Sequence, residues 1–581
     1  MKKSIILTAV SLACVTFASC DDFLNDNRYP LSQQTNDAQY WNNEANVSKQ
    51  CEDLYRNFEG YGDDGYGLFY FQTLTDNQGS GVGGAFTNWS YINVPTSSSL
   101  WQASYEVIRH CNEIIVKTDA STLADGVKAK YIGIARLIRA MQYYELVRAY
   151  GDVPYTDKVL TIDSPELYGK RVDRDEVMDK VYADLDYATK NIGNGTKTTW
   201  SSDLAYAMMS KICLYEGTYC KYRTVEENYK AADPERAKRY LGYVVAAGDV
   251  LMGKGYTLNG DYRSNYNSVS LENNPEMIFY KAYKQSTLTH QTIRYTVAST
   301  VVAGISKDAF DDFLFKDGKP KALTAENTDD AGEIKDNCVV GAGGEKGKVL
   351  SIQKLLDVRD QRLAAIVDTV VCYGTTQEGM TYSRAGSSQL SSSTGYLVRK
   401  FDNTEIPVNF RTGNNYTCAP VFWLSVIYCD YAEAKAELGT LNDNDLNNTL
   451  NKLFARAGLP AQTVAGMSAM TDPANDMNVS NLLWEVRRCR RCETMLDDDL
   501  RYWDLQRWHQ LDKLDTQKNP DIRLGANLKN SDVAFNEMEG DYMKAIPGSE
   551  RVYNKRVYLY PIPSEQISDS KGALEQNANW K

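Results

Sequence analysis

One long segment of the chain, residues 59–95, mixes aromatic rings with Gly, Asn and Asp and shows no regular period. Sugar recognition requires this mixture, because an aromatic face packs on the C–H face of a sugar ring while amide, carboxylate and guanidinium groups bond its hydroxyls. A structureless stretch of this length is usually functional or disordered. Its many aromatic residues argue against disorder. The predicted ligand-binding residues of this segment are Tyr66, Asp76, Asn77, Trp89 and Tyr91.

Further candidates come from the irregular Gly-, Ser- and Asn-rich middle of the chain, residues 256–419. They combine guanidinium and phenol groups, and they are Arg294, Tyr295, Tyr396 and Arg399. The alternative for all of these aromatic residues is that they fill a core beneath the loops. Trp89 is the best candidate for exposure, because it lies between Asn88 and Ser90.

Catalytic and metal chemistry has little support. Cys489 and Cys492 form a CxxC pair, but no second pair accompanies it and the chain holds only three histidines. A structural zinc site needs four ligands, and a redox CxxC belongs beside a βαβ pattern that is not visible here. We therefore predict buried, unreactive cysteines, no catalytic residue, no metal and no cofactor.

The N-terminus predicts export. Lys2 and Lys3 precede a short apolar stretch, which is too short to span a bilayer and fits a secretory signal over residues 1–19. The residues before Cys20 resemble a bacterial lipobox, so Cys20 is the predicted lipidation site. Acidic residues follow directly, and in Bacteroides-type lipoproteins such residues resemble a surface-export signal. A plain signal peptide with an incidental cysteine is the alternative.

Composition limits the partners. The chain has 581 residues, 43% hydrophobic and 24% charged, with a net charge of −12. These values are typical of a globular protein, and the acidic balance disfavours general nucleic-acid binding.

Helical periodicity dominates the first half of the chain. Helices are predicted over 101–118, 127–150, 174–191 and 234–251, and after the irregular middle over 421–438, 446–457 and 481–509. A further helix, capped by Ser201 or Ser202, is predicted to carry Leu204, Met208, Ile212 and Tyr219. They pair into hairpins of about tetratricopeptide size, without the consensus repeat. The predicted fold is mainly α, with a few short strands.

Several ordered motifs resemble the SusD/RagB family. They are Trp101 with Tyr105, Ile108 and Asn112, RDQRL (359–363), YAEAKAELG (431–439), RAGL (456–459), RYWDLQRW (501–508), YPIP (560–563) and QNANW (576–580). Departures occur at Arg490, Thr494, Asp498 and Asp499, where the family has a Glu- and Gly-containing run, and at Ala578, where it usually has proline. Within RYWDLQRW, Asp504 is three residues from both Arg501 and Arg507, which predicts ion pairs along one helix face.

The resemblance implies four tetratricopeptide-type helix pairs packed against a loop-rich irregular portion. It divides the mature chain into residues 20–255 and 256–581, expected to form one fused body. It also implies a surface-exposed, lipid-anchored protein of the outer membrane that captures oligosaccharide or polysaccharide. The partner would be a SusC-like TonB-dependent transporter, and no enzymatic activity is expected. Some relatives bind peptides instead.

Two other classes remain open. A glycoside hydrolase needs two carboxylates flanking the scissile bond, and no hydrolase motif is visible. A scaffold would use the helix pairs to bind protein alone. The sequence leaves open which glycan is bound and whether calcium stiffens a loop.

Overall fold

The structure is a computed structural model, and it describes part of the chain. The described residues are 38–63, 74–79, 93–228, 230–294, 296, 304–339, 346–372, 376–377, 380–381, 392–411, 413–497, 500–530, 538–545 and 551–581.

Long amphipathic helices build the first half. They are α5 (Ser99–Asp119), α6 (Asp125–Tyr150), α7 (Arg174–Asn191), α8 (Ser202–Tyr222) and α10 (Pro234–Met252), preceded by α3 (Ala38–Trp41), α4 (Glu44–Asp53) and the 3-10 helix η1 (Leu54–Asn57). Side-chain caps fix their starts: the Ser201 hydroxyl accepts from Leu204 N and the Asp233 carboxylate from Arg236 N, each satisfying an otherwise unpaired N–H. Pro234 at the first turn pre-sets the helical φ of α10. Helices α5, α6, α7 and α10 confirm the predicted ones to within two residues, and α8 contains the four predicted residues and takes Ser201, one of the two predicted alternatives, as its cap.

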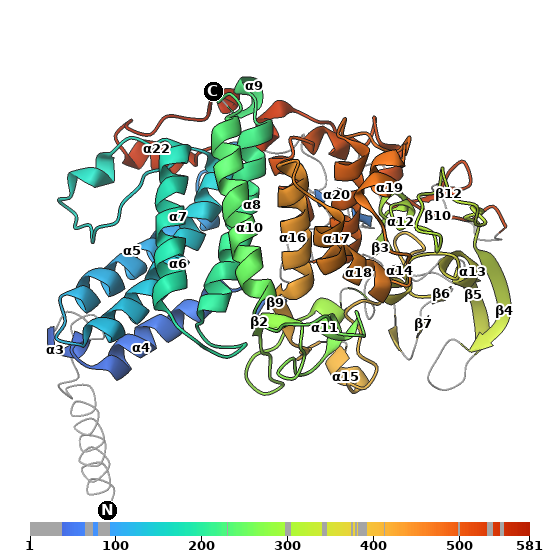
Figure 1. The fold of residues 1–581 in the computed structure, drawn as a ribbon, viewed down its shortest axis with the longest axis horizontal. Helices are drawn as coiled ribbons and strands as arrows, with labels where there is room; N and C mark the ends of the chain where they lie inside the picture. Colours follow the sequence, from blue (N-terminus) through green and yellow to red (C-terminus); the bar gives the residue numbers. More distant parts are fainter. Residues whose placement is uncertain are drawn as a thin grey trace, which may run out of the picture.

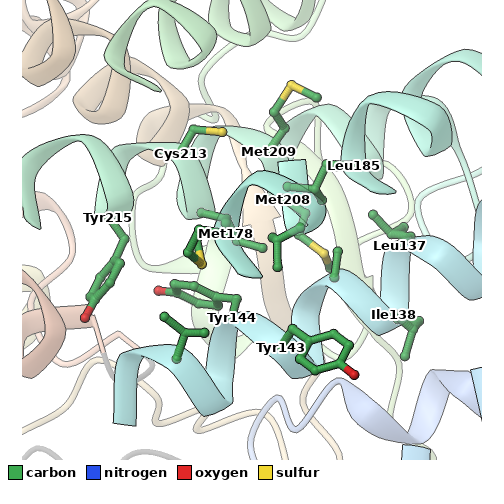
Figure 2. Close-up of a cluster of buried hydrophobic side chains, with 14 of the residues drawn as sticks. Leu137, Ile138, Tyr143, Tyr144, Met178, Leu185, Met208, Met209, Cys213 and Tyr215 are labelled. Carbon is green, nitrogen blue, oxygen red and sulfur yellow. The ribbon is translucent and has the colours of Figure 1, made fainter. Parts of the chain in front are cut away.

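The helices stack in chain order. α5 packs on α6, α6 on α7, α7 on α8 and α8 on α10, after which α10 meets α16 (Leu424–Glu437) and α16 meets α20 (Asn481–Glu493). Figure 1 shows this succession from the blue and cyan helices to the orange ones. Figure 2 shows the filling between α6, α7 and α8, where apolar and aromatic side chains interleave. The mainly helical fold is confirmed.

The later helices differ from the prediction in their boundaries. The predicted helix over 421–438 begins as strand β9 (Ala419–Trp423), because these residues pair with β2 (Met277–Lys281). The predicted helix over 446–457 is two, α17 (Asp443–Asn448) and α18 (Leu450–Arg456). The one over 481–509 is broken into α20 and α21 (Leu500–Arg507), with Leu496 in the left-handed region at φ 66°.

Short strands form small antiparallel sheets in the irregular portion. β1 (Gln78–Gly79) pairs with β3 (Gly304–Ile305), and β7 (Thr376–Gln377) with β8 (Met380–Thr381). The three-stranded sheets have the orders β4-β5-β6 and β10-β12-β11. Their bounds are β4 (Glu333–Val339), β5 (Lys346–Ser351), β6 (Val370–Cys372), β10 (Leu524–Asn527), β11 (Met538–Glu539) and β12 (Tyr542–Lys544).

Short helices connect these elements. They are α9 (Val225–Asn228), α11 (Ser264–Asn267), α12 (Lys307–Asp311), α13 (Gln353–Leu356), α14 (Gln361–Ile366), α15 (Val408–Arg411), α19 (Val464–Ala469) and α22 (Ser564–Asp569), with the 3-10 turns η4 (Pro165–Tyr168), η6 (Leu511–Leu514), η7 (Pro520–Arg523), η8 (Lys555–Tyr558) and η9 (Ala578–Trp580).

Helix α21 ties the C-terminal part to the helical half. Tyr215 of α8 donates to the Gln506 side-chain oxygen at 2.6 Å, and the Gln506 amide donates to the carbonyls of Arg148 and Tyr558. The largest hydrophobic cluster accordingly runs from Trp41 to Leu574. The division at residue 255 stays a prediction. Within the described ranges, no helix is both long and apolar enough to cross a membrane.

Candidate functional site

The structure overturns three of the predicted ligand contacts, because it buries them. Asp76 is 0% exposed and accepts two hydrogen bonds from the Arg501 guanidinium, at 2.8 and 2.6 Å. Asn77 is 1% exposed and accepts from Arg491 Nε at 2.9 Å. Tyr396 is equally buried and stacks on Phe310 with ring centroids 4.2 Å apart. These three side chains hold the fold together and are out of a ligand's reach.

Two predicted residues remain accessible. Arg294 is exposed and donates to the Gln291 side chain, whereas the one-third exposed Arg399 lies 3.6 Å from Asp368. The two arginines thus contact different partners. Tyr66, Trp89, Tyr91 and Tyr295 lie outside the described residues, so their role stays a prediction. Asp76 and Asn77 are brought together, since both contact Arg491.

Asp76 and Asn77 belong to a buried anchor, residues 74–79. Burial raises the cost of ionising Asp76, but Arg491 and Arg501 outweigh it and hold the pKa of this carboxyl well below its usual range. Ser306 donates to the Asp76 carbonyl, and Arg551 to that of Leu74. The anchor therefore fixes in place the chain between two stretches that carry predicted ligand residues, 64–73 and 80–92.

Close packing on Thr394 completes this anchor. A Cβ added at Gly79 would lie 2.5 Å from the Thr394 methyl group, and one at Gly304 would lie 2.1 Å from its hydroxyl oxygen. Real side chains do not approach so closely. Strands β1 and β3 thus need glycine where they cross this threonine.

The main cavity of interest, called here the junction cavity, has a volume of about 390 Å³. It lies between α6 and α8 on one side and β9, α16 and the start of α21 on the other. Exposed Glu59 lines it, so it reaches the surface there. Aromatic rings supply much of the wall: Phe58, Tyr144, Phe422, Trp423, Trp503 and Tyr560.

Polar groups enter the junction cavity at a few points. They are Asn57, Glu59, Gln142, Glu145, Arg148, Lys211, Asp430 and Asp497. The Arg148 guanidinium lies over the Trp503 ring, 4.1 Å from its centroid, which fixes both side chains. Apolar walls with few polar groups are typical of small-molecule sites, which occupy roughly 300–1,000 Å³.

Sequence reasoning missed this cavity. Its walls come from segments far apart in the chain, and most of its aromatic residues lie in helices that the sequence predicts to be core. The one local signal was Gln142, a polar residue of α6 that is flanked by Met141 and Tyr143 and is 8% exposed.

A second hollow, of about 570 Å³, is lined by acidic residues and is called the acidic hollow. Its charges neutralise one another: Arg488 pairs with Asp472, Lys513 with Asp476 at 2.8 Å, and Lys307 with Asp521 at 2.6 Å. Trp484 lines it but is 5% exposed and donates toward Asp472. A ligand would have to compete with these ion pairs, so the junction cavity is the better candidate.

Glu485, beside the acidic hollow, gives a prediction for pH. Burial raises the pKa of this carboxyl to about 7, against the opposing charge of Arg488. Since the folded-state pKa exceeds the unfolded one, the associated stability is complete below roughly pH 4.3 and is lost as the pH rises through 7. We expect Glu485→Gln to raise the free energy of unfolding by up to about 3 kcal/mol at pH 8 and by about 1 kcal/mol at pH 5.

Urea unfolding at both pH values measures this effect. Glu106→Gln, a change at an exposed position of α5, is the control. It should leave the free energy of unfolding unchanged at both pH 5 and pH 8. A Glu485→Gln gain of equal size at pH 5 and pH 8 would contradict the assignment.

One group of possible metal ligands stands among the described residues: Asp175, Glu216 and Cys220, within 4.8 Å of one another. Arg174 and Arg236 donate to the Glu216 carboxylate, and Arg223 donates to Asp175. Burial raises the pKa of the Cys220 thiol, which therefore stays protonated. Three guanidinium groups already supply the positive charge here.

The CxxC cysteines are buried within α20, and both are free thiols. Burial raises the pKa of Cys489 to about 12, which removes the reactive thiolate at neutral pH. This confirms the prediction of buried, unreactive cysteines for this pair.

Comparison with known proteins settles the family. The sequence model described as "SusD family" matches residues 275–580, more than half of the chain. The chain belongs to the SusD family. A second model, described as "Starch-binding associating with outer membrane", matches residues 47–211. The SusD/RagB resemblance of the motifs is thereby confirmed.

Relatives of this SusD-family chain occur in Bacteroidetes. A SusD-like protein of Formosa agariphila is 25% identical over 36% of this chain and 42% of its own length. A SusD-like protein of Bacteroides ovatus is 25% identical over 47% of this chain and 49% of its own length. The chain thus spans less than half of the length of these two relatives. A crystal structure titled as a SusD-like carbohydrate-binding protein of Bacteroides fragilis is 19% identical, with a TM-score of 0.66 over 93% of this chain and 100% of that one. This likeness shows the SusD-like fold.

Proposed function

We propose that this protein captures oligosaccharides or polysaccharides at the cell surface and passes them to a SusC-like TonB-dependent transporter of the outer membrane. The observation that carries the proposal is the pair of family matches, one over residues 275–580 and one, described as starch-binding, over residues 47–211. The similarity of the fold to the SusD-like carbohydrate-binding protein of Bacteroides fragilis supports it.

The geometry supports a sugar ligand. The aromatic walls of the junction cavity suit the C–H faces of sugar rings, and its few polar groups suit hydroxyls. The proposal includes a lipid on Cys20, after removal of residues 1–19, that holds the protein on the outer membrane. Capture and release involve no bond breaking, so the proposed protein binds its ligand and does not convert it.

Binding of the purified full-length protein to plant, host and microbial polysaccharides tests the proposal. We expect saturable binding to at least one of them, and a loss of up to about tenfold in Trp89→Ala, because an aromatic contact contributes about 0.5–1.5 kcal/mol beyond its buried area and 1.4 kcal/mol is a factor of ten. Tyr168→Ala, at a 42% exposed aromatic residue in the α6–α7 connection, is the matched control.

Two outcomes would overturn the proposal. Release of shortened products would point to a glycoside hydrolase. Failure to bind any glycan, together with retention of other surface proteins, would point to a scaffold.

A further inference from the structure

A single buried lysine holds the break between α20 and α21. Within this break, Leu496 lies in the left-handed region at φ 66°. A side chain of this size rarely adopts that conformation, which persists only where the surrounding contacts enforce it. The Lys400 ammonium bonds the residues on both sides of Leu496, because it donates to the Met495 carbonyl at 2.7 Å and to the Asp497 carboxylate. The strained turn is therefore held from both sides by the same charge.

The pair of Lys400 with Asp497 is closed to solvent. Lys400 is 0% exposed, and its ammonium lies 3.6 Å from the centroid of the Tyr266 ring. The Tyr266 hydroxyl in turn donates to Asp497 at 2.9 Å. A buried pair has given up the hydration of both charges, so it is stable only while both partners stay in place. Leu496, Asp497 and Tyr266 line the junction cavity, so the pair supports part of the cavity wall.

The other titratable groups that face this pair keep their charge state near neutral pH. Burial raises the pKa of three surrounding phenols well above its usual value, and they belong to Tyr61, Tyr262 and Tyr266. Burial also opposes ionisation of Glu493, but Arg456 and Arg362 outweigh it and hold the pKa of this carboxyl below its usual range. These groups therefore do not change charge between pH 5 and pH 7.5.

The Asp497 carboxyl, by contrast, titrates in this range. Burial raises its pKa to about 6, against the attraction of Lys400. Burial also lowers the pKa of Lys400, so the two groups titrate as a pair. The chain continues with Asp498 and Asp499, which lie outside the described residues. Because a solvated aspartate has a pKa of about 3.9, the closed pair binds a proton more readily than an opened one, and a rise in pH favours opening.

We propose that Lys400 and Asp497 form a pH-sensitive latch on the wall of the junction cavity. The closed latch keeps Leu496 in its strained turn. Opening lets this turn relax and alters the part of the wall that Leu496 and Asp497 supply. The latch closes in mild acid and opens as the pH rises to neutral and above. This device goes beyond glycan capture and requires no ligand.

Hydrogen exchange of the purified full-length protein at pH 5 and pH 7.5 tests the latch. The Asp497 amide donates to the Thr494 carbonyl at 2.9 Å in the closed turn, so its protection reports opening. After correction for the intrinsic exchange rate, we expect this protection to fall about tenfold from pH 5 to pH 7.5. The factor is ten because opening becomes easier over the one pH unit between pH 5 and the pKa of the closed pair.

Two variants remove the titrating group. Asp497→Asn should abolish the pH dependence of this protection, but it leaves the Lys400 charge buried without a counter-charge. The double variant Lys400→Met with Asp497→Asn removes both charges, which avoids that cost, and its protection should likewise be independent of pH. Glu485→Gln changes another buried carboxyl with a raised pKa, and it should keep the wild-type response.

The outcomes separate the latch from glycan capture. Equal protection of the Asp497 amide at both pH values in the wild type overturns the latch. A pH response that survives in the double variant also overturns it, because another group would then be responsible. A wild-type protein that shows the response but binds no glycan supports the latch and overturns only the proposed function.

Discussion

Replacing Glu433 by alanine is expected to lower the free energy of unfolding by about 3–5 kcal/mol. Glu433 is fully buried on α16 and accepts from both terminal nitrogens of Arg507, at 2.5 and 2.8 Å. It also accepts from the Trp508 indole at 2.6 Å. Its loss leaves a buried guanidinium and a buried indole N–H without this acceptor, at the contact of α16 with α21.

Urea unfolding followed by circular dichroism measures this loss. Glu106→Ala on α5 is the matched control, since Glu106 is an exposed helical glutamate. Its free energy of unfolding should stay within about 0.5 kcal/mol of the wild type. An equal, small change in both variants would show that the ion pair of Glu433 with Arg507 does not stabilise the fold.

Asp76→Asn should also lower the free energy of unfolding by about 3–5 kcal/mol, because it too leaves buried guanidinium groups without a compensating charge. The change keeps the shape of the side chain but removes the negative charge that compensates Arg491 and Arg501, both nearly fully buried. Because Asp76 lies in the buried anchor, we also expect weaker glycan binding under conditions in which the variant is still folded.

The control for this variant is Asp186→Asn, which removes the exposed α7 pair of Asp186 with Lys190. Such pairs contribute about 0.3–0.5 kcal/mol. If Asp76→Asn is as stable as the wild type, residues 74–79 do not anchor the fold through the Asp76 carboxylate. Lower stability with unchanged glycan affinity would show that the anchor does not influence the predicted ligand residues on either side of it.

Local signals in the sequence were enough for the helices of the first half. The 174–191 helix was predicted with its observed limits, since Asp173 caps its start and the apolar period continues to its end. Helix α21 was predicted as part of a longer one, because nothing local announces the left-handed Leu496. Strand β9 was missed because its pairing with β2 joins residues that are more than 100 positions apart.

Long-range pairing also explains the errors at charged residues. Asp504 was expected to pair with Arg501 and Arg507 along one helix, and it does contact Arg507 at 2.8 Å. Arg501 instead reaches Asp76, 425 residues away, and Asp504 takes Arg490 of α20 as its second partner. Residue types therefore predicted which charges need partners, while only the folded chain decides which partners they obtain.

The buried arginines of helix α20 determine how the stability of the protein depends on salt. The four arginines, Arg487, Arg488, Arg490 and Arg491, are at most 4% exposed and take carboxylates from several separate segments. Dissolved ions cannot come between partners that exclude solvent, so screening hardly weakens these attractions. The protein should therefore keep its shape across wide swings in ionic strength, whether it meets brackish or dilute surroundings.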